Sequence, residues 1–261
     1  MQAPLKITII TVCYNSAKTI EQTIQSVLNQ HYPNLEYIII DGASTDGTQN
    51  IVKKYADKIT LFKSEPDKGI YDAMNKGLTL ATGDIVGLLN ADDLYAHAHV
   101  LAKVNTTFER DIDACYGDLI YFPENDQSKV LRYWKSNEFK AGLFAKGWCP
   151  PHPTFFVKRT IYAQQGLFNT TYRMGNDVEL MMRFLEKAKI KSAYIPQVLV
   201  HMRAGGVSNR GFKNILIQNK CILQAARALE IPFSTYGFVF GKLKSRLLQF
   251  IFKPTRDEQY V

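Results

Sequence analysis

The sequence predicts an α/β fold, a doubly wound parallel sheet followed by a helical C-terminal extension. Apolar, β-branched runs alternate with segments of helical periodicity and are joined by short loops, the pattern of strands connected by helices. From about residue 212 onward, apolar positions recur at helical spacing with a break at Ile231-Pro232. The predicted strands of the first part cover residues 6–12, 36–40, 59–63 and 85–89.

Each predicted element follows from its side chains. The run 6–12 is almost wholly apolar, as expected of a central strand buried on both faces. A helix is predicted after Tyr14-Asn15-Ser16 because Ile20, Ile24, Val27 and Leu28 recur at helical spacing. Further helices are expected at 48–55, 72–81 and 177–187, and further strands at 114–122, 154–157, 192–195 and 198–201.

Composition and charge narrow the class of protein. The 261 residues are 46% hydrophobic, enough for a substantial core, and no apolar run approaches the roughly 20 residues of a membrane span. Four scattered cysteines and the absence of a signal-like N-terminus favour a reduced, cytoplasmic protein. Residues 201–261 carry ten Lys and Arg against three Asp and Glu, which is +7 of the total +8. This basic end suits an anionic partner such as a membrane surface.

The C-terminal extension has two interpretations. Within 240–253, apolar and basic side chains lie on neighbouring stripes of a helix, as in helices that bind anionic lipid surfaces. An ordinary surface helix packed on the domain explains the same pattern equally well. The apolar stripe is Leu243, Leu247 and Phe250, and the basic stripe is Lys242, Arg246 and Lys253.

Polar side chains follow three of the predicted strands where each strand ends. Asn15, Asp41 and Asp92 should therefore lie at one edge of the sheet, where open α/β sheets bind ligands. The Asp41 carboxylate suits the N–H of a nucleobase, although a turn or helix-capping Asp is the commoner explanation. Asp92 and Asp93 suit a divalent cation that carries a phosphorylated ligand, with a plain acidic turn as the alternative.

Four ordered motifs resemble glycosyltransferase family 2, most closely bacterial enzymes that build colanic acid and related exopolysaccharides. They are Thr11-Val12-Cys13-Tyr14-Asn15, the turn at 41–48, the segment 65–77 and Asn90-Ala91-Asp92-Asp93. The resemblance is dense over residues 5–95 and scattered to about 208. It implies one Rossmann-like domain of the GT-A (nucleotide-diphospho-sugar transferase) type at 1–211. Residues 1–95 would bind the nucleotide sugar, 96–211 the acceptor, and 212–261 would form the basic helical extension.

The resemblance also implies a donor site and a metal site. Asp92 and Asp93 would hold Mg²⁺ or Mn²⁺ as part of the family's Asp-x-Asp motif, in which Asn90 replaces the usual first Asp and removes one negative charge. Arg203 would stabilise the leaving diphosphate, because a guanidinium group can donate two parallel hydrogen bonds to a phosphate. His201 is the weaker candidate for this role. The complete donor set is Thr11, Tyr14, Asn15, Asp41, Asp67, Lys68, Asn90, Ala91, Asp92 and Arg203.

An acidic residue in the second half is expected to act as the catalytic base. Asp177 stands at the start of a predicted helix, where inverting members of the family place the carboxylate that deprotonates the acceptor hydroxyl. A simple helix-capping role is the alternative. Asn176 and His152 are expected to contact the acceptor, although a loop-stabilising role explains His152 equally well. His31, His97 and His99 are interpreted as structural or surface residues.

The predicted function is that of an inverting, metal-dependent glycosyltransferase. It would move a sugar from a UDP- or GDP-linked donor to a saccharide hydroxyl, on a lipid-linked acceptor at the inner face of the cytoplasmic membrane. A sugar-1-phosphate nucleotidyltransferase would need a Gly-rich, basic loop after the first strand, and residues 13–17 are not that loop. A non-catalytic nucleic-acid-binding protein is disfavoured because residues 1–200 carry 22 Lys and Arg against 21 Asp and Glu, and no nucleic acid is expected as a partner.

Overall fold

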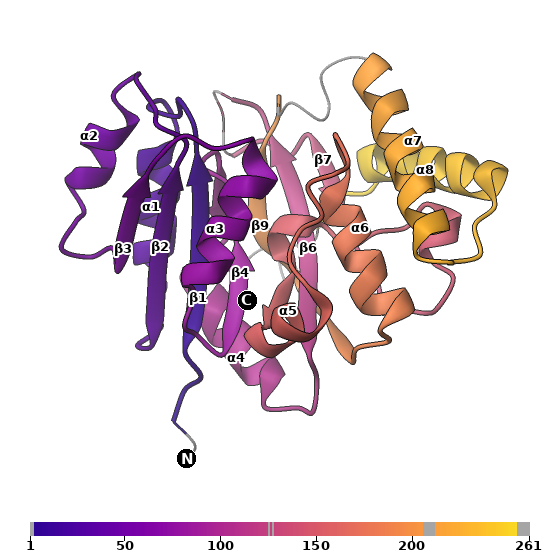
Figure 1. Ribbon diagram of the computed structural model, residues 1–261, viewed down its shortest axis with the longest axis horizontal. Coiled ribbons are helices and arrows are strands. Elements are labelled where there is room, and N and C mark those ends of the chain that lie inside the picture. The colour runs from indigo at the N-terminus through magenta and orange to yellow at the C-terminus, as the bar shows by residue number, and fades with distance from the viewer. Residues whose placement is uncertain (1–2, 125, 127, 206–211, 255–261) are drawn as a thin grey trace.

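The computed structural model describes residues 3–124, 126, 128–205 and 212–254. Within these ranges the chain forms a nine-stranded mixed sheet with helices on both faces (Figure 1). The strand order is β3-β2-β1-β4-β8-β6-β9-β5, and β7 pairs with β6 outside this path. The sheet is parallel in its first part and mixed in its second.

The first part of the sheet has the predicted parallel strands. Its central strand β1 is buried along its whole length, because its side chains face helices on both sides. The register pairs Cys13 with Asp41 and Asp41 with Ser64, so the loops after three strands start side by side. The elements of this part are β1 (Ile7–Cys13), α1 (Ile20–Leu28), β2 (Leu35–Asp41), α2 (Thr48–Lys53), β3 (Leu61–Ser64), α3 (Ile70–Leu80) and β4 (Ile85–Leu88).

The second part departs from the predicted elements in several places. Antiparallel pairing begins where β4 meets β8, and β9 is one continuous strand through Pro196, where two short strands were expected. Four short elements were not predicted. They are the strands β5 (Asp93–Tyr95) and β7 (Arg132–Trp134), which pair with distant strands, and the helices α4 (Val100–Phe108) and α5 (Arg159–Gln165). The remaining elements are β6 (Ala114–Phe122), β8 (Phe156–Lys158), α6 (Asn176–Met182), β9 (Ser192–Arg203), the 3₁₀ turns η1 (Phe144–Lys146) and η2 (His152–Thr154), and the π-helical turn η3 (Arg183–Lys187).

Two hydrophobic cores lie on the two faces of the sheet. The alternation along β1 sends Ile7 and Ile9 to a core that includes α1 and α4. Ile10 and Val12 point to the other core, which includes α3, α5, α6 and α7. This alternation follows from the two-residue period of a strand and explains why β1 needs apolar residues at successive positions.

Two C-terminal helices lie at the end of the molecule away from β1, β2 and β3 (Figure 1). They are α7 (Phe212–Ala228) and α8 (Thr235–Ile251), separated near Pro232 as the sequence predicts. In α7, Ile222, Ala225 and Ala226 are buried, whereas Phe238 is the buried residue of α8. Among the described helices, none combines the length and the apolar character needed to cross a bilayer. The expected domain boundary at residue 211 lies outside the described residues.

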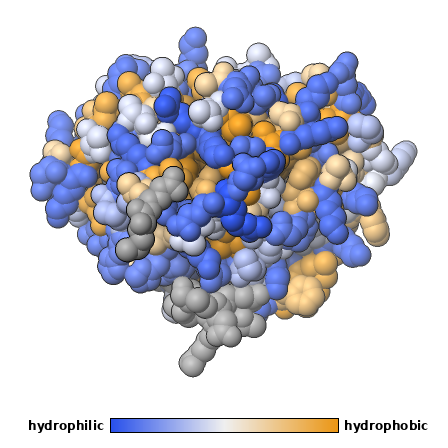
Figure 2. Space-filling model, turned by 90° about the horizontal axis from the view of Figure 1, so that it is seen from below, coloured by the Kyte–Doolittle hydropathy of each residue, from blue (hydrophilic) through white to orange (hydrophobic). Residues whose placement is uncertain are grey.

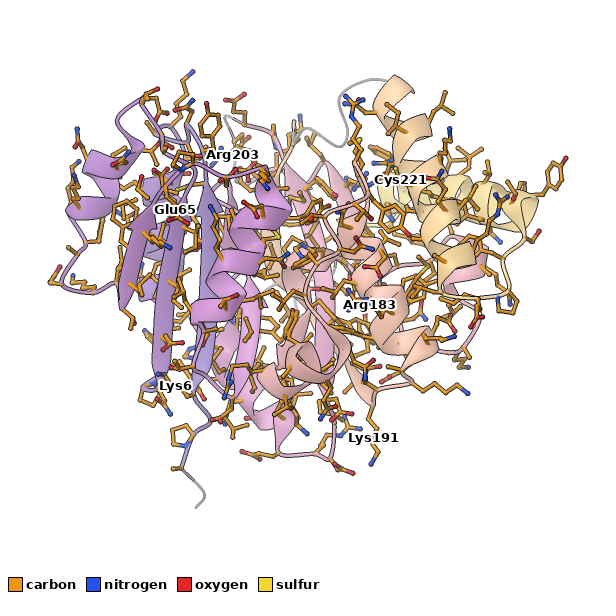
Figure 3. All side chains as sticks on the ribbon, in the orientation of Figure 1. Lys6, Glu65, Arg183, Lys191, Arg203 and Cys221 are labelled. Carbon is orange, nitrogen blue, oxygen red and sulfur yellow. The ribbon has the colours of Figure 1, made fainter. Side chains whose placement is uncertain are left out.

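The two edges of the first part of the sheet differ in what they carry. Figure 3 shows Glu65 and Arg203 toward the edge where β1 and β2 end, and Lys6 and Lys191 toward the opposite edge. That opposite edge is seen face-on in Figure 2 and presents mainly hydrophilic side chains. The loops of interest for function therefore belong to the carboxyl-terminal edge.

Candidate active site

Hydrogen bonds join the loop after β1 to the loop after β2. Asn15 adopts a left-handed conformation with φ 49°, and its Oδ1 atom accepts a hydrogen bond from the Thr45 backbone N–H at 3.0 Å. Its own backbone N–H donates to Ser44 Oγ at 2.7 Å. Asn tolerates this conformation better than most residues, which explains the residue type at this point. Asn15 thus sets the shape of the rim.

Asp41 lies beneath this rim and is fully buried. Its carboxylate accepts hydrogen bonds from the Ser44 backbone N–H (3.0 Å), the Ser44 hydroxyl, the Ser64 hydroxyl (2.6 Å) and the Cys13 thiol (3.5 Å). Two donors on each oxygen fill the lone pairs of a carboxylate. The sequence suggests a direct contact between Asp41 and a nucleobase. Such a contact would require one of these donors to break its hydrogen bond with the Asp41 carboxylate.

Tyr14 and Asp67 flank the rim at Gly42. A Cβ atom on Gly42 would stand 2.5 Å from Asp67 Oδ2 and 3.3 Å from Tyr14 Cδ2, so a larger residue would displace the Asp67 carboxylate. The Tyr14 ring is 66% exposed and offers a flat apolar face to a ligand. Lys68 is exposed beside Asp67, whose Oδ1 accepts from the Gly69 backbone N–H at 2.8 Å.

Thr11 does not reach this rim with its side chain. It is fully buried, and its hydroxyl shares a hydrogen bond of 3.1 Å with the Tyr37 hydroxyl. It therefore supports the site from below.

The segment from Asn90 to Asp93 concentrates acidic groups and unpaired polar atoms. Asp93 is fully buried in β5, and the Asn90 amide donates to its Oδ2 at 3.1 Å. Asp93 Oδ1 and Asn90 Oδ1 are buried without a partner among the described residues. Burial and the adjacent charge of Asp92 raise the pKa of Asp93 well above its usual value, and burial raises the pKa of Asp92. This turn is therefore suited to receive positive charge, while Ala91 fills the buried space between the polar side chains.

Arg203 brings a cation to the same turn. In the pairing of β5 with β9, Met202 lies opposite Asp93, and Arg203 is the next residue of β9. The positive charge of Arg203 counteracts the rise in the pKa of Asp92 and of Asp93. Its two terminal nitrogens donate to Glu124 O (2.6 Å) and Gln22 Oε1 (2.7 Å). Its Nε is buried without a partner among the described residues.

His201 supplies no charge at this end of β9. Burial, with a further contribution from His97, lowers the pKa of His201 to about 4, so its ring is neutral near pH 7. Arg203 is therefore the cation at this turn.

Asp177 stands at the start of α6 on the other side of the site and is partly exposed. The Tyr71 hydroxyl, from the first turn of α3, donates to Asp177 Oδ1 at 3.1 Å. A carboxylate in the first turn of a helix is favoured by the helix dipole. No side-chain hydrogen bond from Asp177 caps α6, so its carboxylate is oriented by Tyr71 and does not serve as an N-cap.

Three further polar residues lie around Asp177. Burial lowers the pKa of His152, opposed by the Asp177 charge, and its Nε2 is buried without a partner among the described residues. Asn176 is buried, with its amide donating to Tyr172 O at 3.1 Å and its Oδ1 unpaired within the described part of the chain. Burial raises the pKa of the Cys149 thiol well above its usual value, which makes it a poor nucleophile.

Tyr121, on β6, connects the two sides of the site. Burial raises the pKa of Tyr121, and the charges of Asp93 and Asp177 add to this rise, so both carboxylates are within electrostatic range of its hydroxyl. Sequence reasoning identified neither Tyr121 nor Tyr71 as functional. Tyr71 belongs to the segment 65–77, whereas Tyr121 sits in an ordinary apolar strand and gives no sequence signal.

The described residues also form surface hollows away from this edge. One is lined by His97, His99, Lys103 and Gln197, and another by Asp84, Lys158 and Arg159. Neither includes a residue of the loops after β1 or β2. We place the site by the convergence of polar groups, because an open rim between loops encloses little volume.

Two curated relatives match most of the chain. A PGL/p-HBAD biosynthesis glycosyltransferase of Mycobacterium tuberculosis is 29% identical over 215 residues, which are 80% of this chain and 81% of the relative. The Escherichia coli UDP-Glc:alpha-D-GlcNAc-diphosphoundecaprenol beta-1,3-glucosyltransferase WfaP is 27% identical over 220 residues, 83% of this chain and 85% of the relative.

Solved structures and a family model complete the comparison. The fold is similar to Staphylococcus aureus TarS in complex with UDP-GlcNAc (TM-score 0.67, 16% identity, 97% of this chain and 74% of TarS). It is also similar to the Pyrobaculum calidifontis mannosyltransferase PcManGT in complex with GDP-Man and Mn²⁺ (TM-score 0.63, 24% identity, 94% and 69%). The model of the family described as glycosyl transferase family 2 matches residues 8–171. The chain therefore belongs to glycosyl transferase family 2 and is a glycosyltransferase of the GT-A fold.

Proposed function

We propose that the protein is an inverting, metal-dependent glycosyltransferase that moves a sugar from a UDP- or GDP-linked donor onto a lipid-linked saccharide. The observation that carries the proposal is the turn from Asn90 to Asp93, where a buried aspartate and unpaired side-chain oxygens lie next to the end of β9 that carries Arg203. Asp177 supplies a separate carboxylate at the start of α6, which accepts a hydrogen bond from the Tyr71 hydroxyl. The ligands named for TarS, PcManGT and WfaP support this choice of donors and acceptor.

The donor's nucleotide would bind at the rim formed by the loops after β1, β2 and β3. The exposed Tyr14 ring offers a face for the base, and the Asp67 carboxylate offers acceptors for its N–H groups. Asp41 and Asn15 would hold this rim in shape from below and from the side. Lys68 is exposed near Asp67 and would reach the phosphates as a mobile point charge.

A divalent cation fits the turn from Asn90 to Asp93 by the chemistry of its donor atoms. Mg²⁺ and Mn²⁺ prefer oxygen ligands, and this turn presents the Asp92 carboxylate with unpaired oxygens of Asn90 and Asp93. The described residues hold no cluster of three or more His, Cys, Asp and Glu arranged for a metal, so the donor phosphates would complete the ligand set. Such an ion, when bound, stabilises the departing diphosphate.

Asp177 would act as the general base. Its carboxylate takes the proton of the acceptor hydroxyl while that oxygen bonds to the anomeric carbon and the bond from that carbon to the diphosphate breaks. Attack from the face opposite the leaving group inverts the anomeric configuration. Arg203 would share the negative charge that develops on the leaving group, and Asn176 and His152 would orient the acceptor.

The C-terminal extension would bring the enzyme to its acceptor at the inner face of the cytoplasmic membrane. We divide the chain as the sequence suggests, into a donor half at 1–95, an acceptor half at 96–211 and the extension at 212–261. The outward side of α8 supports a membrane role, because large apolar side chains are exposed there. They are Tyr236, Val239, Phe240, Leu243, Leu247, Leu248, Phe250 and Ile251.

Calorimetric titration with UDP and GDP, each with and without Mn²⁺, tests the donor side. We expect one nucleotide to bind in the presence of Mn²⁺ and the Asp92→Asn variant to bind it at least about tenfold more weakly, the effect of losing one charged ligand. Asp57→Asn, which changes an exposed acid in the turn after α2, is the matched control and should bind like the wild type. Folded protein that binds neither nucleotide, or Asp92→Asn binding with unchanged affinity, would contradict the assignment.

A further inference from the structure

A reciprocal pair of hydrogen bonds joins Asn75 to the backbone of Phe168. The Asn75 amide donates to Phe168 O at 2.9 Å, and the Phe168 backbone N–H donates to Asn75 Oδ1 at 2.9 Å. Asn75 lies on α3, whereas Phe168 belongs to the loop between α5 and α6 and is 4% exposed. A carboxamide suits this position because it donates and accepts at the same time. Asn75 therefore connects α3 to the loop that leads into α6.

The Phe168 ring lies between two groups of the acceptor side. Its centroid is 5.4 Å from that of the Tyr71 ring and 5.9 Å from that of the His152 ring. Tyr71 stands four residues before Asn75 on α3, so both side chains project from one face of that helix. The Tyr71 hydroxyl in turn donates to Asp177 Oδ1 at 3.1 Å. Direct contacts thus lead from Asn75, through Phe168 and Tyr71, to the candidate base.

The loop that contains Phe168 is also bonded to the helix that carries the base. Arg183 donates to the backbone oxygens of Gly166 (3.0 Å) and Leu167 (2.7 Å). The same guanidinium forms a salt bridge of 2.9 Å with Glu179 of α6. Because these bonds join the loop to α6, the contact of the loop with α3 also sets where α6 begins.

The neighbouring side of α3 holds the segment that leads from β3 to the donor rim. Asp72 Oδ2 accepts a hydrogen bond from the Lys68 backbone N–H at 3.0 Å. One turn later, Lys76 Nζ donates to Pro66 O at 2.8 Å. Helix α3 is therefore bonded to the donor rim on one side and, through Asn75, to the loop before the base on the other.

We propose that Asn75 is a positioning residue, whose carboxamide holds Phe168 and so fixes the Tyr71 hydroxyl and the Asp177 carboxylate relative to the donor rim. The inference rests on the proposed function, in which Asp177 removes the proton of the acceptor hydroxyl. Asn75 acts through Phe168 and Tyr71 and not by contact with a substrate. Because misplacing a reacting group by about 1 Å can slow a reaction about 10²-fold, loss of this pair of bonds should slow transfer at unchanged donor affinity.

The test is the rate at which the full chain transfers radiolabelled sugar, from the nucleotide sugar found to bind, into a lipid extract of the cells that make the protein. We expect Asn75→Ala to lower the maximal rate at least about tenfold, with the donor KM and Kd within about twofold of the wild type. Asn75→Asp has the same size, but an ionised carboxylate does not donate to Phe168 O. It should lower the maximal rate at least about threefold, and it decides if Asn75→Ala does not fold.

Asn105→Ala is the matched control for a loss of stability. Asn105 is also half-buried, and its Oδ1 accepts two hydrogen bonds, from the Leu5 backbone N–H (3.0 Å) and the Tyr32 hydroxyl (2.9 Å). These partners lie at the edge of the sheet opposite the donor rim. We expect Asn105→Ala to lower the melting temperature about as much as Asn75→Ala and to keep the maximal rate of the wild type.

A double variant separates positioning from a merely structural role. If Asn75 acts through Tyr71, removing both groups should cost little more than removing one. We expect Asn75→Ala with Tyr71→Phe to be at most about twofold slower than Asn75→Ala alone. Independent effects would instead multiply, and the double variant would show the product of the two single losses.

Four results would overturn the inference. They are an unchanged maximal rate in the folded Asn75 variants, an equal loss of rate in Asn105→Ala, a loss of donor affinity as large as the loss of rate, and multiplied losses in the double variant. Asp177→Asn in the same assay distinguishes this failure from that of the proposed function. If Asp177→Asn transfers sugar normally, both are wrong. If it loses transfer while Asn75→Ala keeps full activity, only the inference about Asn75 is wrong.

Discussion

At the residue scale, Asp41 is a support on which the donor rim is built. Its buried carboxylate accepts hydrogen bonds from the end of β1 (Cys13), the loop after β2 (Ser44) and the end of β3 (Ser64). Hydrogen bonds to a charged group contribute about 1.5–3 kcal/mol each when the partner is otherwise unpaired. The residue that is free to meet a base is Asp67, which is half-buried at the rim.

Substitutions of these two aspartates should therefore separate stability from binding. Asp41→Asn replaces acceptors by an amide N–H₂ that faces other donors, and we expect a loss of about 2–3 kcal/mol in the free energy of unfolding, measured in urea. Asp67→Asn should leave stability nearly unchanged and weaken nucleotide binding. If Asp41→Asn abolished nucleotide binding at unchanged stability, Asp41 would be a direct base contact.

Tyr71 orients the candidate base and gives a second test at this scale. Without the hydroxyl that donates to Asp177 Oδ1, the carboxylate has more conformational freedom. We expect Tyr71→Phe to lower kcat about tenfold, the equivalent of one hydrogen bond of about 1.4 kcal/mol, with donor Kd unchanged. Tyr55→Phe, which removes a hydroxyl that bonds Glu21 at 3.0 Å, is the control and should keep full activity. An unaltered kcat in Tyr71→Phe would show that Asp177 needs no such positioning.

At the element scale, the sequence predicts the first part of the fold better than the second. The parallel strands β1, β2 and β4 are buried on both faces, so their apolar runs are continuous and easily recognised. The three-residue strands β5 and β7 exist only through pairing with β9 and β6, which no local pattern reveals. The helical pattern at 177–187 marks a real helix, but its last turn is π-helical.

Glu36 joins several elements at the edge opposite the site. Its carboxylate accepts from Lys6 Nζ (2.8 Å), the Thr8 hydroxyl (2.6 Å) and the Thr82 backbone N–H (2.8 Å), linking β1, β2 and the turn before β4. Burial alone would raise the pKa of Glu36, but these hydrogen bonds outweigh it and lower the pKa to about 2.

The free energy of unfolding should depend on pH through the hydrogen bonds of Glu36. Because the folded pKa of Glu36 is below its unfolded value near 4.3, its contribution is present above about pH 4.3 and is lost as the pH falls toward 2. We expect the wild type to lose about 2 kcal/mol more than Glu36→Gln between pH 6 and pH 2.5 in urea unfolding, a value reduced by the partial exposure of Lys6. Equal losses in the two proteins would mean that Glu36 titrates normally.

At the scale of the whole molecule, α8 is the element whose orientation the sequence leaves open. Its periodicity marks an apolar and a basic stripe, and both interpretations, membrane surface or packed helix, use the same pattern. The structure turns Lys242 and Arg246 inward, whereas Lys253 is exposed and Leu243 and Leu247 are more than half exposed. Which stripe faces the domain depends on the close contact with η1, which the sequence alone does not reveal.

Membrane association should depend on the outward side of α8. Each exposed leucine that enters a bilayer surface contributes about 2 kcal/mol, so Leu243→Ser with Leu247→Ser should lower binding to phosphatidylglycerol vesicles at least tenfold in co-sedimentation. The melting temperature should stay the same, because both side chains are exposed in the folded protein. Vesicle binding that is unchanged in the double variant would assign the exposed stripe to another partner.

The candidate site could be predicted only in part at this scale. The residues that follow the strand ends could be identified from the sequence, because the loops after parallel strands lie at one edge of the sheet. Tyr121 could not, because it lies in a strand whose pattern indicates only burial.

The central claim is that donor binding and proton removal belong to different carboxylates. The most direct measurement is transfer of radiolabelled sugar, from the nucleotide sugar found to bind, into a lipid extract of the cells that make the protein. We predict that Asp177→Asn keeps the wild-type donor Kd and loses transfer by about 10²–10⁴-fold, the usual contribution of a general base. Undiminished transfer by Asp177→Asn, in folded protein that binds the donor normally, would contradict the account.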